Sequence, residues 1–499
     1  MPHPLLLERS IRDPIYGMVG LTSEELSVID HPLFRRLHAI RQNGLLNLVW
    51  PSATHTRFEH SIGVVYVADS ILQALRINSR VAARKDPSAV AHPDNAKVSQ
   101  AIDFSLIPRE QIQSIFRVGR LAALVHDLGH GPFSHHFEPF APKAALVRQL
   151  VEEEASLGAL RDLLKESPGI GQDDLFPRAS ASHEPARHEV LSAVLFAKIG
   201  VDLSLQQDLI RDVAATILGR PDLSMTPGLA PFLSLLHDLV ASAPADADRM
   251  DYLERDSRSF GVSYGLYDRP RLLKSFLAFK QTNGDTPGYR LGIKQSGLRA
   301  VENFIQARFE LHVQVYYHKA NRAIQLMLGT IADKVRGGAL SPFAWSDMNS
   351  LATTFRDLTD ERFLDVLRGV SQTWPLEHTE VNELARRIYE RRLWKRVYEG
   401  PDHHRFLDLL NNRLPRADIV ADDVDPHATK DLKSGARPLK RATGGIYEAL
   451  DGTSWLELSP IMKALAEDES HISRIYMCSG DREMYRQLRE EAWRLQGAQ

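Results

Sequence analysis

One helical pattern ends abruptly in histidines and glycines, and it constrains the fold more than any other stretch of the chain. Residues 115–128 read IFRVGRLAALVHDL, whose apolar residues recur every three or four positions, as is typical of a helix with one buried face. Two glycines and a proline within 129–132 then end this helix. His126 and Asp127 are therefore expected at the end of a helix that packs into a core.

Similar periodicity predicts further helices along most of the chain. The expected helices are a segment that starts at Thr56 or Ser61 (SIGVVYVADSILQALRI), ARHEVLSAVLFAKIG, FLSLLHDLVASA continuing into ADADRMDYLERD, and a long pattern from Ser296 to about Lys334. Turn and short-strand signals occupy 9–22, and polar stretches predict surface loops near 84–97 and 166–187. We therefore expect a mainly α fold with short β elements.

The composition and the expected length of the secondary-structure elements change after about residue 400. Shorter elements follow, with more proline, glycine and aspartate, and the segments ADIVADDV and SRIYMCS are typical of strands. This change predicts a large helical core over 1–400 and a smaller α+β region over 401–499.

Composition excludes several classes of function. A net charge of -3 provides no global positive field, so nucleic acid is not a required partner. Cys478 is the only cysteine, which excludes an intrachain disulfide and a cysteine-based zinc site and favours a reducing compartment. No apolar run approaches the roughly 18 residues of a membrane span, and the N-terminus lacks a signal-peptide pattern. These features predict a soluble, cytoplasmic protein that needs no membrane.

Two distant segments carry further candidate metal ligands that could join His126 and Asp127. Alone, a His-Asp pair is more often a cap or a surface feature, because adjacent helical side chains point about 100° apart. His60, however, precedes an apolar helical face, and Asp248 lies in the carboxylate-rich segment ADADRMDYLERD. Imidazole and carboxylate groups are the usual donors for Zn, Fe, Mn, Co and Ni. Side chains on separate helices can therefore reach one cation.

Longer strings resemble a known family. RFEHSIGV, LVHDLGHGPFSHHFE, RHE and DADRMDYLERD are similar to segments of the HD-domain deoxynucleoside triphosphate triphosphohydrolases, including the sterile-alpha-motif-containing branch. DPIYG, FRRLHAIRQNG, YYHKANRA and RRLWKRVYE extend the likeness from about residue 9 to about 400. The resemblance implies a multi-helix HD-domain core. A sterile-alpha-motif domain is not expected ahead of residue 9.

The resemblance implies a metal site made of His60, His126, Asp127 and Asp248. Two nitrogens and two carboxylate oxygens leave coordination positions open for water and for a phosphate oxygen. The donor set suits Mn, Fe, Co or Ni, and also Zn, with additional Mg accompanying a triphosphate.

The family pattern also implies catalytic side chains. His135 resembles the histidine that protonates the leaving oxygen, and Glu189 resembles the carboxylate that orients it. His130 and His188 match further phosphate contacts, with a structural role as the alternative, while Glu138 is expected to cap or to form a salt bridge.

Substrate contacts are expected on several helices. Arg57 lies three positions before His60, and its family counterpart contacts phosphate. Arg308, His312, Tyr316 and Lys319 fall at helical spacing on one stripe, where cations suit phosphate oxygens, although a solvated face is the alternative. The resemblance assigns sugar contacts to Gln42, Tyr252 and Asp256.

The sequence departs from the family at the sugar and the base. Asn43 stands where the best-known members have a leucine under the 2′ carbon, and an amide can hydrogen-bond a 2′-hydroxyl that an apolar wall rejects. Tyr317 replaces a glutamine near the base. Discrimination between deoxynucleotides and ribonucleotides therefore stays open.

An activating nucleotide is also implied, with changes. Arg9 and Asp30 match residues that recognise an activating guanine nucleotide in the animal branch, whereas Arg35 and His38 replace a glutamine and an arginine. A nucleotide-regulated homo-oligomer, dimer or tetramer, is compatible with this pattern.

The sequence thus favours a metal-dependent hydrolase that splits a deoxynucleoside triphosphate (dNTP) into deoxynucleoside and inorganic triphosphate. Two alternatives stay open. One is an HD phosphohydrolase that acts on ribonucleotides, monophosphates or oligonucleotide ends. The other is a nucleotide-sensing or nucleic-acid-binding module whose hydrolysis is incidental.

Overall fold

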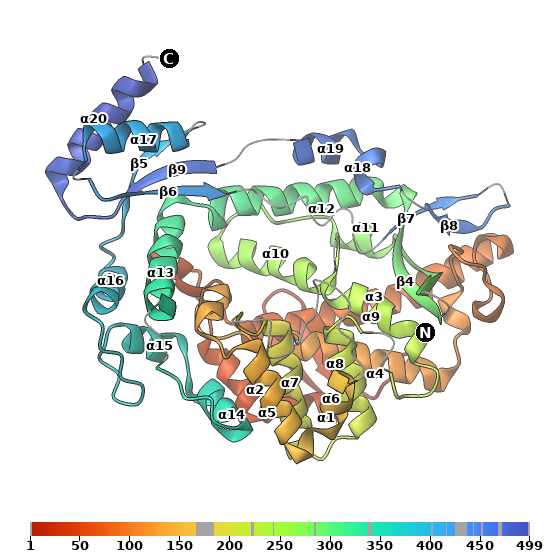
Figure 1. Cartoon of the computed structure of the whole chain (residues 1–499). Helices are drawn as coiled ribbons and strands as arrows, with labels where there is room; N and C mark the ends of the chain where they lie inside the picture. Colours follow the sequence, from red (N-terminus) through yellow and green to blue (C-terminus); the bar gives the residue numbers. More distant parts are fainter. Residues whose placement is uncertain are drawn as a thin grey trace.

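The chain forms a mainly helical body with small sheets at its periphery, as expected (Figure 1). The computed structural model describes residues 2–165, 184–220, 224–242, 244–283, 286–337, 342–400, 403–415, 417–424, 437–442, 444–450, 453–467 and 472–497. Most of the loop expected at 166–187 lies outside these residues.

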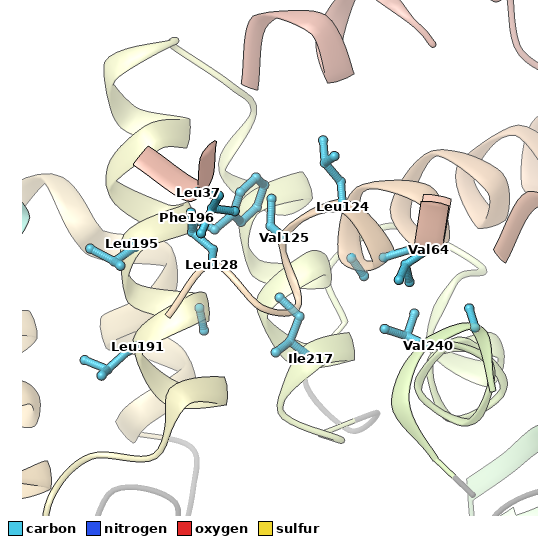
Figure 2. Close-up of a cluster of buried hydrophobic side chains, with 14 of the residues drawn as sticks. Leu37, Val64, Leu124, Val125, Leu128, Leu191, Leu195, Phe196, Ile217 and Val240 are labelled. Carbon is cyan, nitrogen blue, oxygen red and sulfur yellow. The ribbon is translucent and has the colours of Figure 1, made fainter. Parts of the chain in front are cut away.

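A central group of helices surrounds the buried core. Its members are α3 (Arg57–Lys85), α4 (Arg109–Val125), α7 (His188–Asp202), α8 (Gln207–Ile217), α9 (Ala230–Ala241) and α10 (Ala247–Phe260). Helix α4 packs against α3, α7, α8 and α9, and α10 packs against α3. Figure 2 shows the end of α4 in this core, where Val125 and Leu128 lie among apolar side chains that include Phe196 and Ile217. Burial of each such large side chain contributes roughly 1.5–3 kcal/mol.

Local signals explain why α3 begins where it does. Thr56 is the N-cap, and its backbone N–H donates to Glu59 Oε2 at 2.7 Å in a capping box. Of the two expected start sites, Thr56 is therefore the correct one. The helix continues to Lys85, and the following polar stretch forms two 3₁₀ turns, η3 (Pro87–Ala89) and η4 (Pro93–Asn95).

Shorter elements enclose the central helices. On the N-terminal and middle parts of the chain they are α1 (Ser23–Asp30), α2 (Pro32–Arg35), η1 (Arg36–Ala39), η2 (Gly44–Leu48), η5 (Phe104–Leu106), η6 (Ser134–Phe140), α5 (Ala144–Glu153), η7 (Ala155–Leu157), α6 (Gly158–Lys165), α11 (Arg269–Leu273) and η9 (Gln295–Gly297). Further along they are α14 (Met348–Asp357), α15 (Asp360–Leu367), α16 (Thr379–Tyr389), α17 (His403–Arg413), α18 (Trp455–Leu458), α19 (Pro460–Glu467) and α20 (Arg482–Gly497).

Three sheets are present in the described part of the chain. A two-stranded hairpin joins β1 (Arg9–Asp13) to β2 (Gly17–Leu21), in the stretch expected to hold short strands. The second sheet has the order β3 (Phe276–Asn283), β4 (Thr286–Lys294), β7 (Arg437–Arg441), β8 (Tyr447–Ala449). The third has the order β5 (Lys395–Glu399), β9 (Ile472–Met477), β6 (Ile419–Val424). Strands from both sides of residue 400 share these two sheets, and the domain boundary at 400–401 stays a prediction.

The long helix expected from Ser296 to Lys334 is interrupted. Helix α12 (Leu298–Leu311) leads into a π-helical turn, η10 (His312–Tyr316), and α13 (Lys319–Gly337) begins after two intervening residues. The C-terminal sheet binds the chain at this break, since Arg474 donates to the carbonyl of Tyr317 at 2.6 Å. Such turns often occur at functional sites. Because of this turn, residues before and after it no longer lie on one continuous helical face.

In the part of the chain that the structure describes, no helix is both long and apolar enough to cross a bilayer.

A buried arginine joins the N-terminal hairpin to the helical core. Arg120 on α4 is 2% exposed and donates to Glu25 on α1, to Asp69 on α3 and to the carbonyl of Gly20. Removal of Arg120 leaves two carboxylates without their buried partner. We predict that Arg120→Ala lowers the free energy of unfolding by about 3–5 kcal/mol, measured by urea denaturation.

The neighbouring pair of Arg117 and Glu24 provides a matched control. It joins the same two helices, but the Arg117 side chain is 39% exposed. Arg117→Ala is expected to cost about 0–1 kcal/mol. Equal losses in the two variants would contradict the role given to burial.

Candidate metal centre and catalytic cavity

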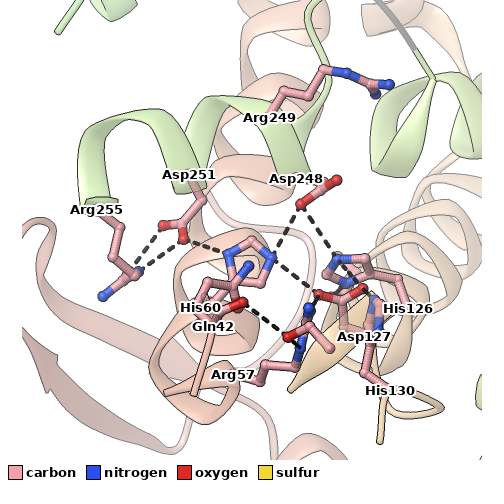
Figure 3. A network of polar contacts seen from close by, with 12 residues as sticks. Gln42, Arg57, His60, His126, Asp127, His130, Asp248, Arg249, Asp251 and Arg255 are labelled. Atoms are coloured by element: carbon pink, nitrogen blue, oxygen red, sulfur yellow. Dashed lines mark hydrogen bonds and ion pairs between the residues drawn. The ribbon is translucent and has the colours of Figure 1, made fainter. Parts of the chain in front are cut away.

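Four side chains from three helices converge on one point. His60 lies on α3, His126 and Asp127 follow the last turn of α4, and Asp248 lies in the first turn of α10. One potential ligand atom from each lies within 4.8 Å of the others. His60 Nε2 is 3.1 Å from Asp248 Oδ1 and 3.4 Å from Asp127 Oδ2 (Figure 3). The structure therefore brings together the four residues that the sequence analysis named as ligands.

A chain of charges behind His60 fixes its ring. His60 Nδ1 contacts Asp251 Oδ2 at 2.8 Å, and Asp251 accepts from Arg255 (Figure 3). Arg255 also donates to Asp13 Oδ2 at 2.8 Å. All these side chains are buried. Gly63 permits this close packing of α3 and α10, because a Cβ at that position would collide with the Asp251 carboxylate. The second ring nitrogen of His60 is thereby directed to the cluster.

Backbone contacts position His126 in a similar way. Its Nδ1 lies 2.9 Å from the carbonyl of Ala123, which leaves Nε2 for the cluster. Ser192 on α7 donates to the carbonyl of His126 at 2.6 Å and accepts from Gly129 N–H at 2.7 Å. Gly129 has to be glycine here, because a Cβ would collide with the carbonyl of His188. The turn after α4 is therefore fixed against α7.

Electrostatics in the cluster favour a positive charge. Burial alone lowers the pKa of His60, but three carboxylate contacts raise that pKa well above its ordinary value. Burial raises the pKa of Asp248, and its contacts with His126 and His60 outweigh burial and hold that pKa far below the usual range. The buried Nε2 atoms of His60 and His126 make no hydrogen bond to the described residues. Two unsatisfied nitrogens beside two carboxylates fit a divalent transition-metal ion.

A cavity of about 470 Å³ opens over the cluster. Many of the residues expected to bind substrate or to act in catalysis line it, together with three of the four proposed ligands. These lining residues are Gln42, Asn43, Arg57, His126, Asp127, His130, His135, His188, Glu189, Asp248, Tyr252, Asp256, His312, Tyr316 and Tyr317. A volume of this size suits a small phosphorylated molecule.

The carboxylate that contacts His135 is not the expected one. His135 Nδ1 lies 2.8 Å from Glu138 Oε1, whereas Glu189 lies 3.5 Å from His188 Nδ1. The contact with His135 that the resemblance implies for Glu189 is made here by Glu138, and the role of Glu189 stays a prediction. Glu138 stands three residues after His135 in η6, so the two side chains lie on one face of the same short helix. Burial raises the pKa of Glu138, but its contacts with His135 and His188 lower it far below the usual range.

The backbone just before His135 is strained. Phe133 and Ser134 adopt positive φ angles of 58° and 59°, which non-glycine residues rarely do. Asp360, on α15, accepts from the backbone N–H of Phe133 and of Arg41, each at 2.9 Å. Burial raises the pKa of Asp360 to about 6. One buried carboxylate thus holds both the loop of His135 and the segment that carries Gln42.

A polar network forms the wall around Asp256. Asn43 Nδ2 donates to Asp256 Oδ2 at 2.9 Å, His55 Nε2 lies 2.6 Å from Oδ1, and the hydroxyl of Tyr316 also donates to Oδ2. The wall is therefore hydrophilic at Asn43. Arg57 contacts Asp127 Oδ2 directly (Figure 3), so its guanidinium lies beside the cluster.

Two expected substrate residues lie away from the cavity lining. Arg308 is buried on α12 but is not among the lining residues. Lys319 lines a different cavity, with Trp394 and Lys395. The single helical stripe expected from 308 to 319 is interrupted, because Tyr317 and His318 lie between the π-helical turn and α13, and the substrate roles of Arg308 and Lys319 stay predictions.

The residues expected to bind an activating nucleotide all lie on the surface, on β1, α1, α2 and η1. They are Arg9, Asp30, Arg35 and His38. None of them lines the cavity. Their role, and the oligomeric state, stay predictions.

Several supporting residues escaped the sequence analysis. Asp251 stands three positions after Asp248, and this spacing was the signal that could have identified it. Arg36 donates to the carbonyl of His130 at 2.8 Å and also to that of Leu128. Neither Arg36 nor Asp360 has a local sequence signal, because both act on loops that are distant along the chain.

Comparisons with known proteins agree with the fold. Residues 271–405 match the family model described as an HD associated region. The crystal structure of a hypothetical protein from Aquifex aeolicus superposes with a TM-score of 0.60 at 24% identity, and the match covers 97% of this chain and 100% of that one. That similarity concerns the fold.

Curated relatives extend over most of the chain. Uncharacterized protein YwfO of Bacillus subtilis is 26% identical over 79% of this chain and 73% of its own length. Uncharacterized protein MJ1154 of Methanocaldococcus jannaschii is 27% identical over 64% of this chain. Deoxynucleoside triphosphate triphosphohydrolase SAMHD1 of Homo sapiens is 26% identical over 78% of this chain. The matches span 48% of MJ1154 and 55% of human SAMHD1, about half of each relative.

The comparisons therefore show what the chain is similar to. Part of it matches an HD associated region, and over most of its length it is similar at 26–28% identity to deoxynucleoside triphosphate triphosphohydrolases and to uncharacterized proteins.

Proposed function

We propose that this chain is a metal-dependent hydrolase that splits deoxynucleoside triphosphates into deoxynucleoside and inorganic triphosphate. The observation that carries the proposal is the convergence of His60, His126, Asp127 and Asp248 beneath a cavity lined by further histidines and an arginine. The named activity of the SAMHD1 relatives supports the choice of substrate.

The four clustered residues would hold one divalent ion of Mn, Fe, Co, Ni or Zn. When bound, such an ion supplies a Lewis acid that lowers the pKa of water and neutralises phosphate charge. Asp251 and the carbonyl of Ala123 fix the rings of His60 and His126, so the two Nε2 atoms are directed before any ion arrives.

The protein's own side chains would carry the rest of the reaction. Hydroxide adds to the α-phosphorus, the bond between phosphorus and the 5′-oxygen breaks, and the 5′-oxygen takes a proton from His135. Glu138 accepts the Nδ1 hydrogen bond of His135 and so presents the other ring nitrogen to the leaving group. Arg57 lies beside Asp127, where it can contact a phosphate oxygen.

One feature supports a second candidate, hydrolysis of ribonucleoside triphosphates. Asn43 presents an amide at the wall formed with Asp256, where an apolar side chain would leave a 2′-hydroxyl unpaired. A buried hydroxyl without a hydrogen-bond partner costs about 1–3 kcal/mol. A ribonucleotide whose 2′-hydroxyl bonds to the Asn43 amide would avoid this cost. Both classes of triphosphate therefore belong in the same assay.

We predict that the Mn²⁺-loaded chain converts dNTPs to deoxynucleoside and triphosphate in equal amounts. The assay incubates all eight common dNTPs and NTPs in ¹⁸O-labelled water and separates the products by chromatography with mass detection. Attack at the α-phosphorus places the label in the triphosphate. Nucleoside monophosphate with pyrophosphate, or label in the nucleoside, would contradict the proposed bond cleavage.

A second prediction concerns the proposed ligands. In protein loaded with Mn²⁺, His126→Ala is expected to lose both the bound ion and turnover, because the change removes one of the two nitrogen donors of the four-residue cluster. Elemental analysis of the dialysed protein measures the Mn²⁺ content, and His92→Ala, at a half-exposed surface histidine, is the control that keeps both. Retention of a full Mn²⁺ equivalent by the His126 variant would remove His126 from the ligand set.

A third prediction separates proton donation from metal binding. His135→Ala should lower kcat by about 10²–10⁴-fold, the usual worth of general acid catalysis, while metal content stays unchanged. Glu138→Gln should lower kcat more than Glu189→Gln does, because Glu138 is the carboxylate in contact with His135. If the Glu189 variant proved the more damaged, the expected family pairing would be restored.

A further inference from the structure

A second group of three histidines lies beside the four clustered residues. His130 follows α4, His135 lies in η6 and His188 begins α7. One ring nitrogen from each lies within 4.8 Å of the others. The rings of His130 and His188 stack with their centroids 3.9 Å apart, and His135 meets His130 edge-on at 4.9 Å.

Each of these rings has one nitrogen near a carboxylate. His130 Nε2 is 3.3 Å from Asp127 Oδ1, and Glu138 Oε1 lies 2.8 Å from His135 Nδ1 and 3.5 Å from His188 Nδ1. Histidines that bind metals usually donate their other N–H to a carboxylate in this manner, which leaves the ligating nitrogen unprotonated. Asp127 and Glu138 thus lie beside one nitrogen of each ring, and the other nitrogen of each ring is left for a ligand.

One of these donors is buried without a partner. His130 is 3% exposed, and its Nδ1 makes no hydrogen bond to any described residue. A buried polar atom in this condition destabilises the fold unless a ligand satisfies it. The His135 side chain is 66% exposed, so the group is accessible from solvent on that side.

We propose that His130, His135 and His188 form a second binding site, for a divalent cation that prefers imidazole ligands, such as Zn²⁺, Co²⁺ or Ni²⁺. Three nitrogen donors with a carboxylate nearby are typical of sites for these ions, whereas Mg²⁺ prefers oxygen donors. The site is separate from the four-residue cluster, although Asp127, a member of that cluster, also contacts His130.

Occupation of this second site inhibits turnover. This consequence rests on the proposed function, because it takes His135 to be the proton donor. A cation bound to the donating nitrogen of His135 prevents that nitrogen from carrying a proton. Excess Zn²⁺ is therefore inhibitory, and excess Mg²⁺ is not. Binding of the cation to the second site does not depend on which nucleotide is the substrate.

The test counts metal ions in the full chain without substrate. Chelator-stripped protein is dialysed against excess Zn²⁺ and analysed by inductively coupled plasma mass spectrometry. Wild type should bind two Zn²⁺ per chain, His188→Gln one, and His126→Ala one, with the remaining ion in the second site. His92→Gln is the matched surface control and should bind two. Circular dichroism verifies folding, and His135→Gln, at an exposed position, replaces His188→Gln if that variant does not fold.

The outcomes separate the second site from the proposed function. One Zn²⁺ per wild-type chain, absent from His126→Ala, would overturn the second site and leave the hydrolase proposal standing. Two Zn²⁺ that persist in both His188→Gln and His135→Gln would also overturn it. Two Zn²⁺ in wild type, one in His188→Gln and no turnover with Mn²⁺ would support the second site alone. Full Mn²⁺-dependent turnover with the second site filled would overturn the inhibitory role.

Discussion

The contact between His60 and Asp251 is the interaction on which the site depends. His60 is fully buried, and it lies between Asp251 on one side and Asp127 and Asp248 on the other. A buried imidazole among carboxylates is tolerated only because Arg255 balances Asp251 and is itself balanced by Asp13. This row of charges joins β1, α3 and α10. The hairpin at the N-terminus therefore contributes to the same buried network as the cluster.

The remainder of the cavity depends on contacts from far along the chain. Asp360 fixes the strained Phe133 and the backbone of Arg41, and α7 supplies both Ser192 behind the metal-facing turn and His188 in front of it. The C-terminal sheet holds the chain after the π-helical turn through Arg474 and Tyr476. Tyr316, at the end of that turn, reaches Asp256. Elements far from the cluster in sequence thus set the shape of the cavity that covers it.

Local patterns predicted the parts of this fold that local forces determine. Apolar periodicity and the glycines that follow predicted a helix over 115–128, and α4 ends at Val125, while the start of α3 at Thr56 was one of two start sites that the sequence left open. The proximity of His60 and Asp248 to that turn came from the family resemblance, since nothing in the spacing brings three helices together. Residues whose roles depend on tertiary contacts were missed or misplaced. Glu138 rather than Glu189 contacts His135, Lys319 lines a different cavity, and Asp360 carries no local signal.

Anomalous X-ray diffraction from crystals grown with Mn²⁺, recorded near the manganese absorption edge, tests the central claim most directly. The account predicts an anomalous peak at bonding distance from the Nε2 atoms of His60 and His126 and from carboxylate oxygens of Asp127 and Asp248. A peak bound by other side chains, or none at that point with Mn²⁺ in excess, would contradict it.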